Sequence, residues 1–190
     1  MKQVIVDAFL EYQRIYKEDD KLVLFKEFLD RTSGDDVIDW NNFDGHVVAS
    51  AFVMSKREKL FALVYHNEFK MYIYPGGHIT IDDVTPLMAA KREVAEETGL
   101  KNVEVVSLSE DANIPFDIDI HHISYNEKLD LPEHYHFDFR YFFVVDHMSD
   151  LSIDETDSSG YEWVTFEELS KNPHYEKCIY KIENLLKKEA

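Results

Sequence analysis

Residues 76–100, GGHITIDDVTPLMAAKREVAEETGL, are the most informative part of the sequence, and their second half carries the signals of one short amphipathic helix. Thr85 is a preferred N-cap residue, Pro86 suits the first helical position, and Gly99 suits the left-handed residue that ends a helix. Between them, four residues recur at helical spacing on one side: Leu87, Ala90, Val94 and Thr98. We expect that side to pack on the core of the domain.

Three carboxylates occupy a different side of the same helix. Glu93, Glu96 and Glu97 are close enough in sequence to share one face, where a like-charge pair costs roughly 0.2–0.5 kcal/mol in an isolated helix. One interpretation is a solvated acidic face with local ion pairs, since Arg92 can reach Glu96. The other is a hard divalent cation, because Mg²⁺ and Mn²⁺ prefer oxygen ligands and are commonly shared with substrate phosphates.

The longer pattern resembles the signature of the Nudix hydrolases. Residues 92–100, REVAEETGL, preceded by Gly77, contain all the fixed positions of the C-terminal half of that signature. The loop from Gly77 is one residue longer than usual, so the place of a glutamate is taken by Asp82, Asp83 or Val84. The resemblance implies an α/β/α sandwich with a mixed β-sheet, a mixed α and β class of fold, and hydrolysis of a diphosphate bond.

The same resemblance implies roles for these side chains. Glu93, Glu96 and Glu97 would hold Mg²⁺, with Mn²⁺ as a substitute, and the backbone carbonyl of Gly76 would complete the shell. Glu93 would be a further ligand or the group that orients or deprotonates water, and Arg92 would pair with the carboxylates and fix their rotamers. In many relatives an acid from a late loop joins the metal, and the candidates here are Asp154, Glu155 and Asp157.

Composition excludes several kinds of partner. The formal net charge is −18 at pH 7, which argues against nucleic acid and against an anionic membrane surface, since both are bound through Lys and Arg. The only cysteine, Cys178, excludes an internal disulfide and fits a reducing compartment. With no signal-like start and no apolar run of membrane-spanning length, we expect a cytoplasmic protein that acts on a small molecule.

The first residues predict a helical extension. Apolar residues recur at helical spacing over residues 3–31, and a polar run at residues 17–20 indicates a break between two helices. We expect an N-terminal helical extension over residues 1–40 and a Nudix domain over residues 41–190, which ends in an amphipathic helix. The apolar stripe of the extension indicates packing on the domain or on a second subunit, so a homodimer is one expected state.

Two later stretches predict an antiparallel hairpin. Residues 116–125, FDIDIHHISY, and 134–145, HYHFDFRYFFVV, alternate with period two, and residues 46–54 are apolar or small on both faces, as in a central strand. One face of the hairpin gathers His, Asp and Arg. It is either a solvated sheet face or a set of groups that hydrogen-bond phosphate, ribose or a base.

This face is similar to that of one subgroup of Nudix proteins whose substrates are undetermined. The marks of that subgroup are a Gly-His start, a D-x-D-x-H strand and an H-x-D-x-R strand. Here they fall on Gly45-His46, on Asp117, Asp119 and His121, and on His136, Asp138 and Arg140. The candidates for substrate contact are therefore His46, His121, His136, Asp138 and Arg140.

Together these patterns predict an Mg²⁺-dependent hydrolase that cleaves the pyrophosphate linkage of a nucleoside diphosphate derivative, such as ADP-ribose, a nucleotide sugar or a dinucleotide. One alternative is a Nudix-fold sensor that binds a nucleotide or nucleotide sugar without cleaving it, although such a module has no need of the glutamate trio. Another is an isoprenoid-diphosphate isomerase, whose chemistry as usually described needs a cysteine near the site.

Overall fold

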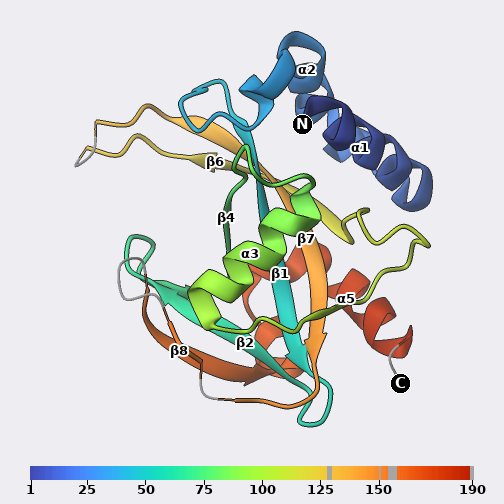
Figure 1. Cartoon of the computed structure of the whole chain (residues 1–190), viewed down its shortest axis with the longest axis vertical. Coiled ribbons are helices and arrows are strands. Elements are labelled where there is room, and N and C mark those ends of the chain that lie inside the picture. Colours follow the sequence, from blue (N-terminus) through green and yellow to red (C-terminus); the bar gives the residue numbers. More distant parts are fainter. Residues whose placement is uncertain (128–129, 150, 154–157, 189–190) are drawn as a thin grey trace.

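Two long parallel strands, β1 (His46–Ser55) and β7 (His134–Val145), form the centre of the molecule (Figure 1). The structure is a computed structural model that describes residues 1–127, 130–149, 151–153 and 158–188. Around the central pair, the other strands of the described chain are β2 (Leu60–His66), β3 (Met71–Ile73), β4 (Gly76–His78), β5 (Glu104–Val105), β6 (Asp117–Ile123) and β8 (Ser158–Thr165).

The sheet is mixed. Its main order is β3-β2-β1-β7-β5, while β4 pairs with β1, β6 with β7 and β8 with β2. Only β1 and β7 run parallel among the described strand pairs, and the remaining pairs are antiparallel. Short 3₁₀ turns complete the chain at Asp19–Lys21, Gly34–Val37 and Pro173–Tyr175. The expected hairpin is β6–β7, and the expected central strand is β1.

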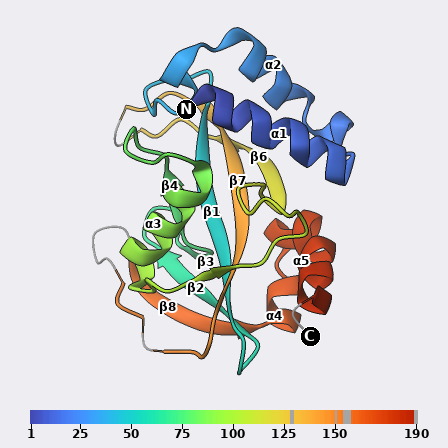
Figure 2. The same ribbon diagram turned by 45° about the vertical axis from the view of Figure 1, so that its right-hand side comes forward.

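Helices cover both faces of the sheet, as Figures 1 and 2 show. On one face, α1 (Lys2–Tyr16), α2 (Val23–Arg31) and α3 (Pro86–Thr98) share a core with residues such as Ala49 and Phe139. On the other face, α4 (Phe166–Ser170) and α5 (Glu176–Lys188) share a second core with residues such as Phe52 and Phe142. The predicted α/β/α sandwich is confirmed.

The capping signals predicted from the sequence are confirmed in α3. The Thr85 hydroxyl accepts a hydrogen bond from the Met88 amide at 3.2 Å, and Gly99 ends the helix with φ of 76°. The four residues expected on the core side are buried: Leu87, Ala90, Val94 and Thr98. The strand β4 was expected to be a loop, because a three-residue strand containing two glycines shows no alternation.

The N-terminal helices pack on their own domain. Phe25 and Phe28 of α2 stack on Phe137 of β7, with ring centroids 4.8 and 4.6 Å from it. The predicted break is confirmed, since α1 ends in a left-handed Lys17 with φ of 55°. The division of the chain at residue 40 stays a prediction, because both parts contribute to one core. Every helix in the described residues is too short or too polar to cross a bilayer.

A buried lysine ties three elements together. Lys181 of α5 is 1% exposed and bonds to Asp117 of β6 at 2.5 Å and to Glu18 at 2.8 Å, beside the rings of Tyr12 and Tyr16. The burial of Lys181 was not predicted from the sequence, because a lysine on an amphipathic helix is ordinarily solvated. This cluster anchors α1 and α5 to the edge of the hairpin.

Candidate active site

Arg92 organises the acidic side of α3. Its five N–H donors are all engaged: the Nε and Nη2 groups bond to Asp83, at 3.2 and 2.9 Å, and Nη2 also bonds to the carbonyl of His78 at 2.8 Å. Its Nη1 group lies 2.8 Å from both Glu93 and Glu96. The prediction that Arg92 pairs with the neighbouring carboxylates therefore matches its contacts, and these contacts restrict the rotamers of both glutamates.

The loop before α3 contributes one acid. Asp83 is buried, and it accepts hydrogen bonds from the Thr80 amide and hydroxyl at 2.8 and 2.9 Å while it binds Arg92. Asp82 and Val84 are exposed. The lengthened loop offered three residues for the place of the glutamate: Asp82, Asp83 and Val84. Of these, Asp83 is the one that binds Arg92 of α3, because the turn at Thr80 folds it back toward the helix.

Glu97 reaches the glycine strand. Its Oε2 atom accepts a hydrogen bond from the Gly76 amide at 3.0 Å. In an extended strand the N–H and C=O of one residue point to the same side, so the Gly76 carbonyl also points toward α3. Gly77 lies against Glu93, since a Cβ on Gly77 would be 2.8 Å from the carboxyl carbon and both its oxygens. The glycine pair therefore packs directly on two of the three glutamates.

These residues fit a divalent cation by their chemistry. The donors are oxygen atoms, and burial raises the pKa of Glu93 even though the Arg92 charge opposes that change. Because one Arg92 nitrogen lies 2.8 Å from both Glu93 and Glu96, the two carboxylates face a shared point of positive charge. As they stand, Glu93 and Glu96 are held by Arg92 and Glu97 by the Gly76 amide, so the three carboxylates do not converge on one point. Ligation would need small side-chain rotations.

The glycine pair gives a test with a built-in control. Gly77→Ala is expected to displace Glu93, whose carboxylate is the end of a flexible side chain, and so to lower activity while leaving the fold stable. Gly76→Ala would place a Cβ 2.6 Å from the Ser50 Cα atom and is expected to destabilise the protein by about 1–3 kcal/mol, as overpacking does. Urea unfolding and turnover of both variants check this. Equal losses of stability would contradict it.

The polar face of the β6–β7 hairpin is buried around Arg140 and partly exposed at His121. Register pairs Asp117 with Arg140, Asp119 with Asp138, and His121 with His136, so the predicted alternation is confirmed. Arg140 is 4% exposed and binds Asp117, Asp119 and Asp138 at 3.1, 2.9 and 3.2 Å. The interpretation of a solvated sheet face is wrong, because α5 and the ring of Tyr74 cover this part of it.

Arg140 and Asp138 hold each other in place. Asp138 also accepts hydrogen bonds from Ser50 at 2.7 Å and from Tyr74 at 3.2 Å. Burial would raise the pKa of Asp119, but the His121 hydrogen bond and the Arg140 charge lower it to about 2. The Arg140 side chain is 4% exposed and each of its three nitrogens donates to a carboxylate, so the predicted contact of Arg140 with a phosphate would require this cluster to open.

Histidines gather at the end of the same face. His46, His136 and His121 are direct register partners across β1, β7 and β6, and His134 and His78 flank them. Burial, together with the charges of the neighbouring histidines, lowers the pKa of His46 to about 4 and that of His136 to about 2. For His46, the Asn42 backbone and the Asp39 charge act in the opposite direction. His78 was not expected here, because β4 was not.

The remaining candidates contribute less. Asp154, Glu155 and Asp157 lie outside the described residues. Cys178 is buried, and burial raises the pKa of its thiol to about 12, so it packs in the core as expected. The thiol is therefore no candidate for the cysteine that an isomerase would use. The isomerase interpretation loses its only available residue, because the chain has a single cysteine.

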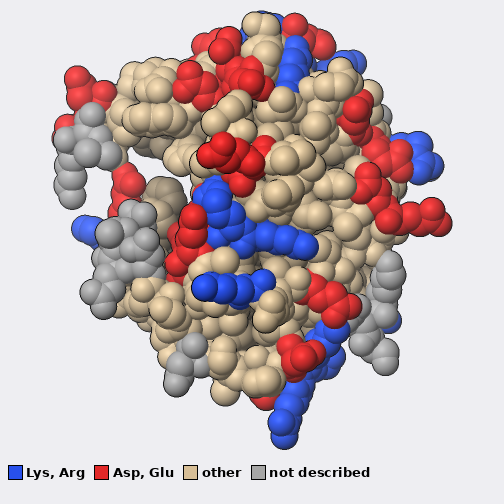
Figure 3. Space-filling model, viewed as in Figure 1, with Lys and Arg blue, Asp and Glu red and all other residues tan. Residues whose placement is uncertain are grey.

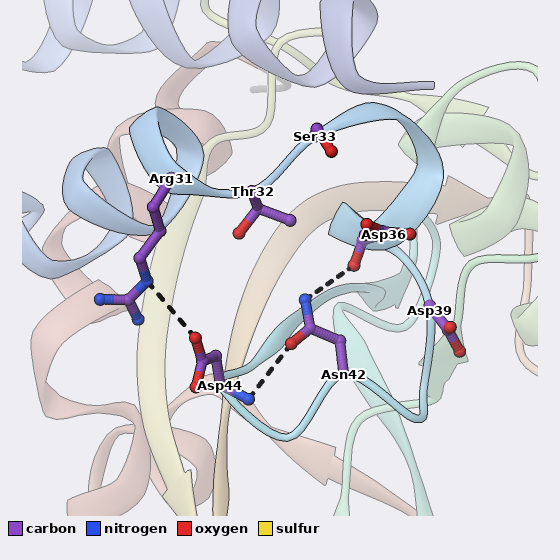
Figure 4. Close-up of a pocket in the computed structure, with 7 residues that line it drawn as sticks. All are labelled: Arg31, Thr32, Ser33, Asp36, Asp39, Asn42 and Asp44. Carbon is purple, nitrogen blue, oxygen red and sulfur yellow. Dashed lines mark hydrogen bonds and ion pairs between the residues drawn. The ribbon is translucent and has the colours of Figure 1, made fainter.

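The surface over α3 combines both signs of charge. Figure 3 looks onto this helix and shows basic and acidic side chains side by side near its centre. A shallow depression of about 470 Å³ lies elsewhere, at the turn after α2 (Figure 4), where Arg31 pairs with Asp44 at 3.7 Å and the Asn42 side chain bonds to the Asp36 carbonyl at 3.0 Å. Its acidic lining contains none of the predicted catalytic residues.

Comparison with known families decides the identity of this arrangement. The family model described as NUDIX domain matches residues 44–182. The chain belongs to the Nudix family. The matched range includes the whole glutamate helix and the hairpin, so the resemblance read from residues 76–100 is confirmed, and the protein is a Nudix-type hydrolase.

Relatives of this Nudix protein support the assignment. A probable DHNTP pyrophosphohydrolase of Lactococcus lactis subsp. cremoris is 31% identical over 145 residues, which are 76% of each chain. A Nudix-family hydrolase of Clostridium perfringens has a TM-score of 0.55 at 23% identity, over 75% of this chain and 96% of that one. The E. coli dihydroneopterin triphosphate pyrophosphohydrolase has a TM-score of 0.52 at 12% identity, over 70% and 91%. These two structures share the fold.

Proposed function

We propose that this protein is an Mg²⁺-dependent pyrophosphohydrolase that cleaves a diphosphate linkage in a nucleoside diphosphate derivative, such as ADP-ribose, a nucleotide sugar or a dinucleotide. The observation that carries the proposal is the arrangement of α3, whose glutamates are fixed by Arg92 and by the glycine strand. Nudix enzymes generally use divalent metals, and an oxygen-rich donor set suits Mg²⁺ or Mn²⁺.

The roles of the chain follow from these contacts. Glu96, Glu97 and the Gly76 carbonyl would hold the cation, and Glu93 would be a further ligand or would orient and deprotonate the attacking water. When bound, Mg²⁺ lowers the pKa of water and neutralises charge on a diphosphate. Arg92 is a positioning residue, since each of its donors is already bonded within the protein. The net charge of −18 makes a cation at this point necessary for an anionic substrate.

Substrate contacts are proposed on the histidine face. His121 is the most accessible of the candidates, with a side chain 38% exposed, and its Nδ1 atom is 3.3 Å from Asp119. That contact leaves the other ring nitrogen available to a ribose or base. His136 is partly buried and His46 is buried, whereas Asp138 and Arg140 are buried further along the same face of β7 and would act by holding the strands in register.

A panel of substrates tests the proposal. It contains ADP-ribose, nucleotide sugars, dinucleotides, dinucleoside polyphosphates and modified nucleoside triphosphates, and the 31% identical relative adds dihydroneopterin triphosphate. We expect Mg²⁺-dependent cleavage of at least one compound, with two phosphorylated products. Tight binding measured by calorimetry, with no product in Mg²⁺ or Mn²⁺, would instead identify a sensor.

A further inference from the structure

A second group of metal-ligating side chains lies away from the glutamates of α3. Within the described part of the chain, His46, His134 and His136 are the only three His, Cys, Asp or Glu residues whose ligand atoms all lie within 4.8 Å of one another. They come from two adjacent parallel strands, β1 and β7, where His46 and His136 are direct register partners. Their backbone positions are therefore fixed by the centre of the sheet.

The hydrogen bond of His134 to the Pro132 carbonyl determines which of its ring nitrogens has a lone pair for coordination. Its Nδ1 atom lies 2.8 Å from the Pro132 carbonyl, which can only accept, so Nδ1 carries the proton. In the neutral ring Nε2 then has a lone pair, which accepts a hydrogen bond from Nε2 of His136 at 3.1 Å, so an ion bound between the two rings would replace the His136 proton. A backbone carbonyl behind a histidine is the arrangement that orients metal-ligating imidazoles in proteins.

His46 supplies an independent observation. It is 1% exposed, and neither of its ring nitrogens has a hydrogen-bond partner within 3.5 Å and in good geometry, although the Asn42 backbone is near enough to act on its pKa. Buried polar atoms in native proteins nearly always have a hydrogen-bond partner or a bound ion, so a buried imidazole without a well-formed hydrogen bond indicates a missing ligand. Its ring lies 4.6 Å from that of His136 and 5.1 Å from that of His134, centroid to centroid, so the partner would be shared with them.

We propose that His46, His134 and His136 bind a first-row transition-metal ion of the Zn²⁺ type. Three neutral imidazoles suit Zn²⁺, Co²⁺, Ni²⁺ or Cu²⁺ and are poor ligands for Mg²⁺. Zn–N bonds of about 2.0–2.1 Å imply nitrogens roughly 3.4 Å apart, so the His134–His136 pair already has the spacing and His46 has to turn toward it. Three protein ligands leave one position open.

This site goes beyond the proposed hydrolysis and does not depend on it. The glutamates of α3 offer oxygen ligands and the histidines offer nitrogen, so the two sites select different ions. They approach each other at His78, whose carbonyl binds Arg92 and whose ring lies 5.1 Å from that of His46. Coordination would occupy one nitrogen of His46 and one of His136, so a direct contact with a substrate would be left to the other ring nitrogen of each.

Metal titration of the full chain tests the site. Purified protein stripped of metal is titrated with Zn²⁺ by chelator competition and with Co²⁺ by visible absorption, both in excess Mg²⁺ to occupy the glutamate site. The variants are His46→Gln and His136→Gln. The matched control is His122→Gln, which alters an exposed histidine on β6 that points to the opposite side of the strand.

We expect the wild type and the control to bind one Zn²⁺ and to show Co²⁺ bands of a low-coordinate nitrogen site. Removing a residue that is hydrogen-bonded to a ligand typically lowers metal affinity by about 10–100-fold. Each variant removes a ligand itself, so its Zn²⁺ affinity should fall by more than that. Equal binding by wild type and variants, or none by the folded wild type, would overturn the proposal. Should a variant fail to fold, X-ray absorption of the Zn²⁺-loaded wild type decides: three imidazoles support the site, and an oxygen shell contradicts it.

Discussion

Replacing Glu97 by glutamine is expected to lower kcat by about 10²–10³-fold, the cost of losing one group that stabilises charge in a transition state. Glutamine has the same shape and keeps an oxygen that can accept the Gly76 amide, which donates to Glu97 at 3.0 Å. The charge that attracts a cation is lost, whereas the bond between α3 and β4 is retained. Turnover in Mg²⁺ with the best substrate of the panel, together with thermal unfolding, measures both effects.

The control for Glu97→Gln is Glu104→Gln. Glu104 lies on β5, its side chain is 67% exposed, and its partner is the surface Lys56. An exposed pair of this kind contributes little, so kcat and stability should both stay near those of the wild type. Turnover of Glu97→Gln equal to that of the control, in a folded protein, would remove Glu97 from the reaction.

Replacing Arg140 by leucine is expected to destabilise the protein by about 3–5 kcal/mol, because it leaves buried carboxylates without their cation. Asp117 keeps its bond to Lys181, but Asp119 and Asp138 lose their main charged partner. The free energy of unfolding in urea measures the effect. Arg57→Leu, at an exposed turn between β1 and β2, is the control and should change it by less than about 0.5 kcal/mol.

A second substitution separates the charge effect from packing. Adding Asp119→Asn to Arg140→Leu removes one buried carboxylate that has lost its arginine partner, so the double variant should recover part of the lost stability. If Arg140→Leu alone costs less than about 1 kcal/mol, the cluster is not an electrostatic support for the hairpin. In that case its predicted role in substrate contact would become the better explanation of the arginine.

Local signals account for what the sequence predicted well. The caps of α3 at Thr85 and Gly99 act within one turn of the chain, so the helix could be placed before any tertiary structure was known. The hairpin was equally accessible, because a period of two in each strand fixes which side chains share a face. The positions of the acidic helix and of the polar hairpin could therefore both be predicted from the sequence.

The burial of polar side chains by elements distant in the sequence could not be predicted. Arg140 was expected on an open face, but whether a polar strand face is solvated depends on what packs over it, here α5 and Tyr74. Lys181 and His78 belong to the same class, since each is brought into a cluster by an element far away in the chain. The choice of Asp83 within the lengthened loop depended on a turn whose shape is set by Arg92.

The most direct test of the central claim is the affinity of α3 for a hard cation, measured as free Mn²⁺ by electron paramagnetic resonance. The His136→Gln background excludes the histidine cluster, and Mn²⁺ is the weakest of the first-row ions for imidazole. The account predicts that this protein binds Mn²⁺ and that adding Glu96→Gln and Glu97→Gln weakens binding by at least about 10-fold. Unchanged Mn²⁺ affinity after removal of both carboxylates would contradict it.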